Sequence, residues 1–179
     1  AQAAPPGAAG REHAMTASDL YPTSLRLLGR PVLVVGGGRV AGRRMGALLD
    51  AGALVSVVAP EPGEEVERLA AAGLLTLHSR PYRPSDLDGA WFAQTATGDR
   101  AVDGAVASDA EARRVWCVDA SDAESSAAWT PAVVRAGDVT VAVNAGGDPR
   151  RARALKDASA DALSTGGLPL RRRRARCAL

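Results

Sequence analysis

The sequence is poor in aromatic residues, cysteine and histidine. Aromatic residues make up 3% of its 179 residues, so a hydrophobic core has to be built from alanine, valine and leucine. The two cysteines, Cys117 and Cys177, form no CxxC pair and no disulfide framework, which fits a reducing cytoplasm, and we expect Cys117 to be a small buried residue. Because the chain has only two histidines, a structural zinc site is not expected and we predict no metal-binding residues.

Long apolar runs, an excess of charge and a leader-like start are also missing. No run of 18 apolar residues is present, which argues against a membrane span. The 22 basic and 20 acidic residues give a formal charge of +2, which is too small to indicate a nucleic-acid partner. Residues 1–19 start with a stretch rich in alanine, proline and glycine, without the regions of a secretory signal. We therefore expect a disordered extension there and a cytoplasmic protein.

Strand and helix patterns alternate from residue 30 onward. Short β-branched runs end at glycine or proline, and the segments between them carry apolar residues at helical spacing. The predicted strands are 30–35, 53–59, 74–78, 91–97, 115–118 and 139–143, and the predicted helices are 40–51, 64–72, 102–113 and 150–163. This alternation predicts an α/β fold with a parallel sheet and crossover helices.

The first predicted strand runs directly into a glycine-rich turn that opens a helix. Residues Gly36 to Ala41 fit the pattern G-x-G-x-x-[GA]. Gly36 would permit the tight turn, Gly38 would let backbone N–H groups approach a pyrophosphate, and Ala41 would let the helix pack closely on the strand. The pyrophosphate then lies at the helix N-terminus, where free N–H groups favour negative charge. A purely structural turn is the alternative, but the strand–turn–helix context favours nucleotide binding.

The end of the second predicted strand leaves the choice of nucleotide open. Its first carboxylate is Glu61, which either binds a ribose hydroxyl, as in NAD-binding domains, or is a solvated loop charge. Arg39 and the pair Arg43 and Arg44 would suit the additional phosphate of NADP. Arginines on an exposed helix are usually only solvated, so both nucleotides stay open at this point.

Several segments of the chain, in order, resemble one known family. They are LRLLGRPVLVVGGGRVAGRRMGALLDAGALVSVVAPE (25–61), TATGD (95–99), ARRVWCV (112–118), WTPA (129–132) and VTVAVNAGGDP (139–149). These segments resemble the amino-terminal domain of the siroheme synthase family, whose members are precorrin-2 dehydrogenases and often also sirohydrochlorin ferrochelatases. The resemblance covers residues 20–165.

The resemblance implies a Rossmann-type NAD-binding domain at 20–120, a small C-terminal dimerisation or helical region at 121–165, and a basic tail or linker at 166–179. It implies NAD as the cofactor, precorrin-2 as a tetrapyrrole substrate oxidised to sirohydrochlorin, and a homodimer. Ferrous iron would be a further substrate where chelatase activity is present. With the glycine turn and the carboxyl edge of the sheet, the predicted cofactor-binding residues are Gly36, Gly37, Gly38, Arg39, Val40, Pro60, Glu61 and Thr97.

The catalytic residue that the resemblance implies falls at a place where this chain departs from the family. Members carry an aspartate shortly after the fifth strand, which is thought to serve both reactions. In an ungapped reading from Cys117 to Pro131, Ser121 falls there, and Asp119 and Asp122 flank it. Either carboxylate would be a general base for the proton that leaves the substrate. We favour Asp122, which lies in a polar turn, over Asp119; a solvated Asx turn is the alternative for each.

Two other functions share the glycine turn. One is a non-catalytic NAD-binding regulatory domain, and the other is a chelatase-only homologue with a vestigial nucleotide site. The intact Gly36 and Gly38 argue against a vestigial site. Regulatory domains would not be expected to carry segments 129–132 and 146–149, so these segments favour the dehydrogenase.

Overall fold

The structure, a computed structural model, describes residues 20–168. The predictions for residues 1–19 and for residues 169–179 of the basic tail, which include Cys177, lie outside the described residues. The chain divides into two compact units, one of Thr23–Thr130 and a smaller one that contains residues 131–168. Within residues 20–168, no helix is both long and apolar enough to cross a membrane.

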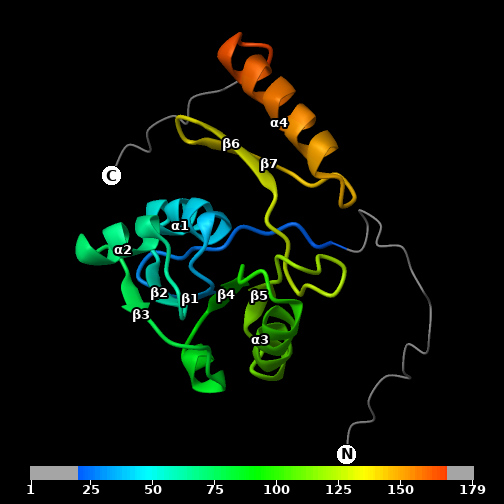
Figure 1. The fold of residues 1–179 in the computed structure, drawn as a ribbon. Helices are drawn as coiled ribbons and strands as arrows, with labels where there is room; N and C mark the ends of the chain where they lie inside the picture. Colours follow the sequence, from blue (N-terminus) through cyan, green and yellow to red (C-terminus); the bar gives the residue numbers. More distant parts are fainter. Residues whose placement is uncertain (1–19, 169–179) are drawn as a thin grey trace, which may run out of the picture. The chain divides into compact units, whose positions relative to one another are not determined.

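The larger unit is a parallel sheet with helices on both faces (Figure 1). Its strand order is β3-β2-β1-β4-β5, with every neighbouring pair parallel. The strands are β1 (Pro31–Val35), β2 (Leu54–Val58), β3 (Thr76–His78), β4 (Phe92–Thr95) and β5 (Trp116–Val118), and the helices are α1 (Arg39–Asp50), α2 (Glu64–Ala71), the short 3-10 helix η2 (Pro84–Leu87) and α3 (Arg100–Ala112). The predicted α/β Rossmann-type fold is confirmed.

The apolar residues of β1 divide between two cores, one on each face of the sheet. Val32 and Val34 pack in a cluster with Met45 of α1. Leu33 belongs to the opposite cluster, with Val106 of α3. Successive side chains of a strand point to opposite faces, so a continuous apolar run suits a strand that is covered on both sides. Because β1 pairs with both β2 and β4, the strand order reverses beside it, and open α/β sheets bind their ligands at such a switch point.

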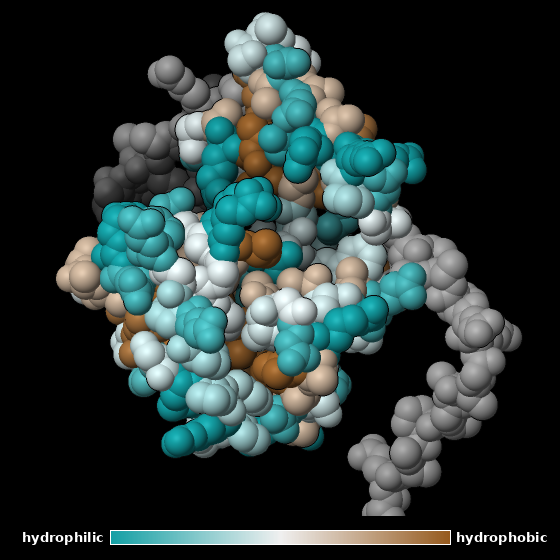
Figure 2. Space-filling model, in the orientation of Figure 1, coloured by the Kyte–Doolittle hydropathy of each residue, from teal (hydrophilic) through white to brown (hydrophobic). Residues whose placement is uncertain are grey.

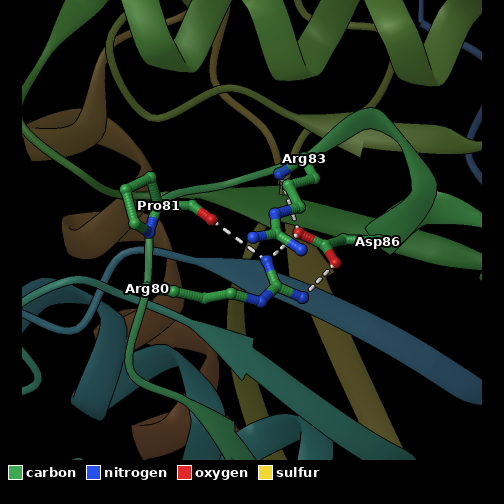
Figure 3. Close-up of polar contacts among 4 residues, drawn as sticks. All are labelled: Arg80, Pro81, Arg83 and Asp86. Atoms are coloured by element: carbon green, nitrogen blue, oxygen red, sulfur yellow. Dashed lines mark hydrogen bonds and ion pairs between the residues drawn. The ribbon is translucent and has the colours of Figure 1, made fainter.

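A bidentate ion pair holds the crossover from β3 to β4 (Figure 3). Arg80 donates from Nη1 to Asp86 Oδ2 at 2.9 Å and from Nη2 to Asp86 Oδ1 at 2.6 Å. Arg80 Nη1 also donates to the Pro81 carbonyl oxygen at 3.0 Å, and the Arg83 N–H donates to Asp86 Oδ2 at 2.8 Å. The hydrogen bonds from Arg80 hold the pKa of Asp86 below its usual range. These contacts fix the start of η2, whose Leu87 is buried in the core on the α3 side.

The smaller unit is an antiparallel hairpin with one helix. It contains β6 (Ala132–Ala136), β7 (Val139–Val143) and α4 (Pro149–Ser164). Gly137, at φ 59°, takes the first position of the two-residue turn between the strands. Among the described residues of this unit, Leu163 is the one buried hydrophobic residue. The hairpin valines are only partly covered, and Figure 2 shows hydrophobic side chains exposed among hydrophilic ones there.

Most predicted elements are present, with ends that differ by a few residues. Helix α3 begins at Arg100 and not at residue 102, because the Asp99 carboxylate accepts hydrogen bonds from the first free N–H groups and caps the helix. Strand β4 ends at Thr95 and not at residue 97. Strand β6 was not predicted, because its sequence follows a proline and contains Arg135, and its pairing with β7 is what makes it a strand.

Candidate functional site

The turn after β1 is built on Gly36, which is packed against the loop after β4. The Gly36 N–H donates to the Val58 carbonyl oxygen at 2.9 Å, and the Ala96 N–H donates to the Val35 carbonyl oxygen at 2.8 Å. Gly36 has φ +112°, and a Cβ at this position would lie 2.4 Å from the Ala96 carbonyl oxygen. A residue with a side chain therefore does not fit, and the turn and the β4–α3 loop lie in direct contact at the switch point.

Gly37 packs against the loop after β2. A Cβ on Gly37 would lie 2.8 Å from the Pro62 Cα and 3.3 Å from the Glu61 carbonyl oxygen. The Gly63 N–H donates to the Gly37 carbonyl oxygen at 2.9 Å. Pro60 and Glu61 are exposed in this loop. The structure thus brings the glycine turn and the predicted Glu61 segment together.

The N-terminus of α1 is open and carries no competing negative charge. Gly38 is the residue that precedes the helix, no side chain caps it, and the first turn contains no acidic residue. A Cβ on Gly38 would meet nothing within 4 Å. Arg39 and Val40 are exposed, whereas Ala41 is fully buried against the sheet as predicted. An uncapped helix start with free space before it fits the pyrophosphate of a dinucleotide.

The loop between β4 and α3 is held by a buried aspartate. Thr97 donates to Asp103 Oδ1 from its hydroxyl at 2.7 Å and from its N–H at 3.2 Å. The Asp99 N–H donates to the Thr97 hydroxyl oxygen at 3.0 Å. Both donors of Thr97 are therefore used within the protein. If this residue contacts a ligand, its carbonyl oxygen would make the contact.

Asp119 follows β5 directly and is buried. Its Oδ1 accepts hydrogen bonds from the Ser121 N–H at 2.7 Å and the Ser121 hydroxyl at 2.8 Å. The same oxygen accepts from the Thr95 hydroxyl and from the Asp122 N–H, both at 3.3 Å. The Asp119 N–H donates to the Ser126 hydroxyl at 2.8 Å. Asp119 thus holds the loop after β5 in place from inside the protein.

Asp122 lies further along the same loop and is only partly buried. Its Oδ1 accepts from the Glu124 N–H at 3.1 Å and from the Ser125 N–H at 3.2 Å. Hydrogen bonds from Ser125, first of all from its backbone, hold the pKa of Asp122 below its usual range. The Trp129 indole N–H donates to the Ala123 carbonyl oxygen at 2.6 Å and closes the loop. Asp122 is therefore an ionised carboxylate that the loop leaves accessible.

Other chemistry is limited among the described residues. No group of three or more His, Cys, Asp and Glu side chains in residues 20–168 is arranged to hold a metal ion. Cys117 is buried, as predicted, and burial raises the pKa of its thiol to about 12. Such a thiol stays protonated at neutral pH and is a poor nucleophile.

Sequence patterns did not single out Asp103, and they indicated Arg44 only as a residue that would suit the additional phosphate of NADP. Asp103 is 1% exposed, although a charged residue is rarely buried without a partner. One signal was available, since Asp103 lies on the same helical face as Val106 and Ala110, which are core residues. Arg44 carries a buried donor, Nη1, that has no hydrogen-bond partner among the described residues.

The fold, the glycine turn and the open helix start together define a dinucleotide-binding domain of the Rossmann type. A family described as "Putative NAD(P)-binding" matches residues 23–132. A solved structure described as "SirC, precorrin-2 dehydrogenase" is 30% identical, covers 79% of this chain and 70% of that chain, and superposes with a TM-score of 0.68. The chain belongs to the NAD(P)-binding family that includes precorrin-2 dehydrogenase and the amino-terminal region of siroheme synthase.

Curated relatives agree with this assignment. Siroheme synthase of Chromobacterium violaceum is 42% identical over 139 residues, which are 77% of this chain and 30% of the relative. Siroheme synthase 3 of Aeromonas hydrophila is 37% identical over 140 residues, 78% of this chain and 30% of the relative. Siroheme synthase of Escherichia coli is 40% identical over 141 residues, 78% of this chain and 31% of the relative. The chain thus spans less than one third of the length of these relatives.

Proposed function

We propose that the chain is an NAD-dependent dehydrogenase that oxidises precorrin-2 to sirohydrochlorin. The observation that carries the proposal is the likeness to a solved precorrin-2 dehydrogenase over 70% of that chain, combined with an intact glycine turn. A non-catalytic regulatory domain would need the nucleotide site only. The dehydrogenase also needs a base at the carboxyl edge of the sheet, and the loop after β5 offers one.

The residues at the carboxyl edge fit NAD. The uncapped N–H groups at the start of α1, beside Gly38, would hold the pyrophosphate, because the helix dipole and the free donors favour an anion. Glu61 would bind the ribose hydroxyls, and its negative charge would repel the additional phosphate of NADP. NAD, when bound, supplies the acceptor for a hydride.

The proposed cofactor-binding set is completed by six further residues, Gly36, Gly37, Arg39, Val40, Pro60 and Thr97. Gly36 and Gly37 lie in the loop after β1, Pro60 in the loop after β2 and Thr97 in the loop after β4. Arg39 and Val40 are the first two residues of α1. The contacts of Gly36 with Ala96 and of Gly37 with Pro62 hold these three loops together. This position beside the switch point of the sheet, where the class of fold binds nucleotides, supports the proposed set.

The oxidation removes two hydrogens from the substrate, one as a hydride and one as a proton. We assign the proton to Asp122, because its carboxylate is partly exposed and its hydrogen bonds keep it ionised at neutral pH. Asp119 is nearly fully buried and accepts the Asp122 N–H, so its part is to hold the loop. In this assignment Asp122 is the catalytic residue and Asp119 a positioning residue.

Iron insertion and dimerisation are the finer parts of the proposal. Insertion of ferrous iron into sirohydrochlorin releases two pyrrole protons, and the same carboxylate would accept them. The half-buried valines of the hairpin offer an apolar surface for a second copy of the chain. Sedimentation velocity tests the homodimer, and iron added to the product of the oxidation tests the chelation.

The experiment that separates the candidate functions measures NADH formation and tetrapyrrole oxidation in the same anaerobic sample. A dehydrogenase forms one NADH for each precorrin-2 oxidised. A regulatory domain binds NAD and forms no NADH, and a chelatase-only homologue consumes ferrous iron and sirohydrochlorin without any effect of NAD. Either of these two results would contradict the proposal.

A further inference from the structure

A buried carboxylate on α3 lies behind the proposed cofactor site. Asp103 is 1% exposed, and among the described residues its carboxylate accepts hydrogen bonds from Thr97, in the preceding loop. It forms no ion pair with a lysine or arginine within 4 Å among the described residues. Burying a carboxylate is costly unless it is hydrogen-bonded. The hydrogen bonds from Thr97 therefore stabilise the buried carboxylate of Asp103.

The loop that Asp103 holds is the one that contacts the glycine turn. Thr97 follows Ala96, whose carbonyl oxygen occupies the space beside Gly36 and whose N–H donates to Val35 at 2.8 Å. Because both donors of Thr97 bind Asp103, the carboxylate ties this loop to the first turn of α3. The backbone of the loop lies beside the glycine turn, at the switch point where open α/β sheets bind their ligands.

The charge of Asp103 also acts on the guanidinium of Arg44. Arg44 lies on α1, the helix that starts at the glycine turn. Burial lowers the pKa of the Arg44 guanidinium, Arg43 lowers it further, and Asp103 raises it.

We propose that Asp103 is a positioning residue for the dinucleotide. Its carboxylate holds the Thr97 loop against the glycine turn, beside which the nucleotide would bind. The inference rests on the proposed function, because it assumes that NAD is the ligand of this site. Loss of the carboxylate then weakens NAD binding, even where the fold survives.

The test measures the Kd of NAD by calorimetry on the full chain, with no tetrapyrrole present. Asp103→Ala removes the acceptor and is expected to raise the Kd about tenfold, the loss of a hydrogen bond to a charged group. Asp103→Asn keeps an oxygen that accepts from Thr97 and is expected to stay within about threefold of wild type. In the Asp103 variants, we expect the kcat for the proposed substrate, measured at saturating NAD, to change less than the KM for NAD.

A control in the same helix separates positioning from stability. Val106→Ala creates a cavity next to the same sheet and lowers stability without touching the Asp103–Thr97 contact. It is expected to leave the Kd of NAD unchanged at a temperature where it is folded. Should Asp103→Ala fail to fold, Thr97→Val removes the hydroxyl donor alone and is expected to raise the Kd as well.

The outcomes distinguish the inference from the function on which it rests. A wild-type Kd in both Asp103→Ala and Thr97→Val would overturn the positioning role and leave the dehydrogenase proposal intact. A Kd that rises equally in Val106→Ala would also overturn it, because the effect would then follow stability. Absence of NAD binding in the wild-type chain would overturn the proposed function, and the inference with it.

Discussion

The carbonyl oxygen of Ala96 lies 2.4 Å from the place that a Cβ of Gly36 would occupy. This single contact joins the turn after β1 to the loop after β4, the two segments that flank the switch point. It leaves no space for any side chain at residue 36, and the φ of +112° disfavours one as well. The glycine turn is thus required by packing before any ligand is considered.

Three of the glycines of α1 and its turn are expected to respond differently to substitution by alanine. Gly36→Ala lowers the free energy of unfolding by about 2 kcal/mol or more, because backbone strain and a clash add up. Gly38→Ala leaves the melting temperature unchanged, since no atom lies within 4 Å of the new Cβ, and weakens NAD binding. Gly46→Ala, in the exposed middle of α1, is the control and raises stability by up to about 1 kcal/mol.

Thermal unfolding with and without NAD checks this set. A Gly36→Ala variant as stable as wild type would contradict the packing described at the switch point. A Gly38→Ala variant that binds NAD as tightly as Gly46→Ala would contradict the assignment of the pyrophosphate to the start of α1.

Glu61 is expected to decide between NAD and NADP. Glu61→Gln removes the charge that would repel the extra phosphate, so the ratio of the two Kd values shifts toward NADP by about tenfold. Glu67→Gln, an equal change of charge on the exposed face of α2, is the matched control and leaves the ratio unchanged. Titration of both variants with both nucleotides gives the answer, and equal ratios in the two would remove Glu61 from the site.

Substitutions at Asp119 and Asp122 are expected to separate a structural role from a catalytic one. Asp122→Asn keeps the acceptor for Glu124 and Ser125, so the melting temperature stays close to wild type while kcat falls about 100-fold or more. Asp119→Ala leaves the partly buried Ser121 N–H without its partner and lowers the free energy of unfolding by about 1–3 kcal/mol.

Asp119→Asn completes this comparison, because it keeps the acceptor oxygen and removes the charge. Its kcat is expected to stay within about threefold of wild type, since the loop keeps its hydrogen bonds. Initial rates of precorrin-2 oxidation give the comparison. A larger loss of kcat in Asp119→Asn than in Asp122→Asn would make Asp119 the catalytic residue and Asp122 the positioning residue.

The ion pair of Arg80 and Asp86 is expected to make the stability of the protein depend on pH in the acidic range. The pKa of Asp86 is lower in the folded protein than its ordinary value, so its contribution is present above a pH of about 4 and is lost as the pH falls through the folded pKa. Asp86→Asn lacks this contribution, so its melting temperature is lower at pH 7, and its difference from wild type shrinks as the pH falls below about 4. Parallel curves for the two proteins between these pH values would speak against the ion pair as a source of stability.

The sequence predicted the parts of the fold that depend on local pattern. The apolar run before Gly36 and the helix up to Gly52 are local signals, and both elements lie within a residue or two of their predicted bounds. Strand β6 depends on pairing with β7, and this is a partner that local pattern does not show. The resemblance supplied the family, which the comparisons confirm.

The interior of the candidate site was harder to predict. Nothing local marks Asp103 as the partner of Thr97, because the contact depends on how the first turn of α3 folds back on its loop. The same holds for Asp119, whose carboxylate binds four groups, including Thr95 from the neighbouring strand. For Asp119 and Asp122 the sequence offered two candidate bases, and burial is what separates them.

The most direct test of the account is the absorbance of precorrin-2 mixed with the purified chain under anaerobic conditions, with and without NAD. We expect the sirohydrochlorin spectrum to appear only with NAD, and we expect Gly38→Asp, which places a negative charge at the start of α1, to abolish it. Absence of oxidation above a sample without protein, while calorimetry shows NAD binding, would contradict the dehydrogenase function.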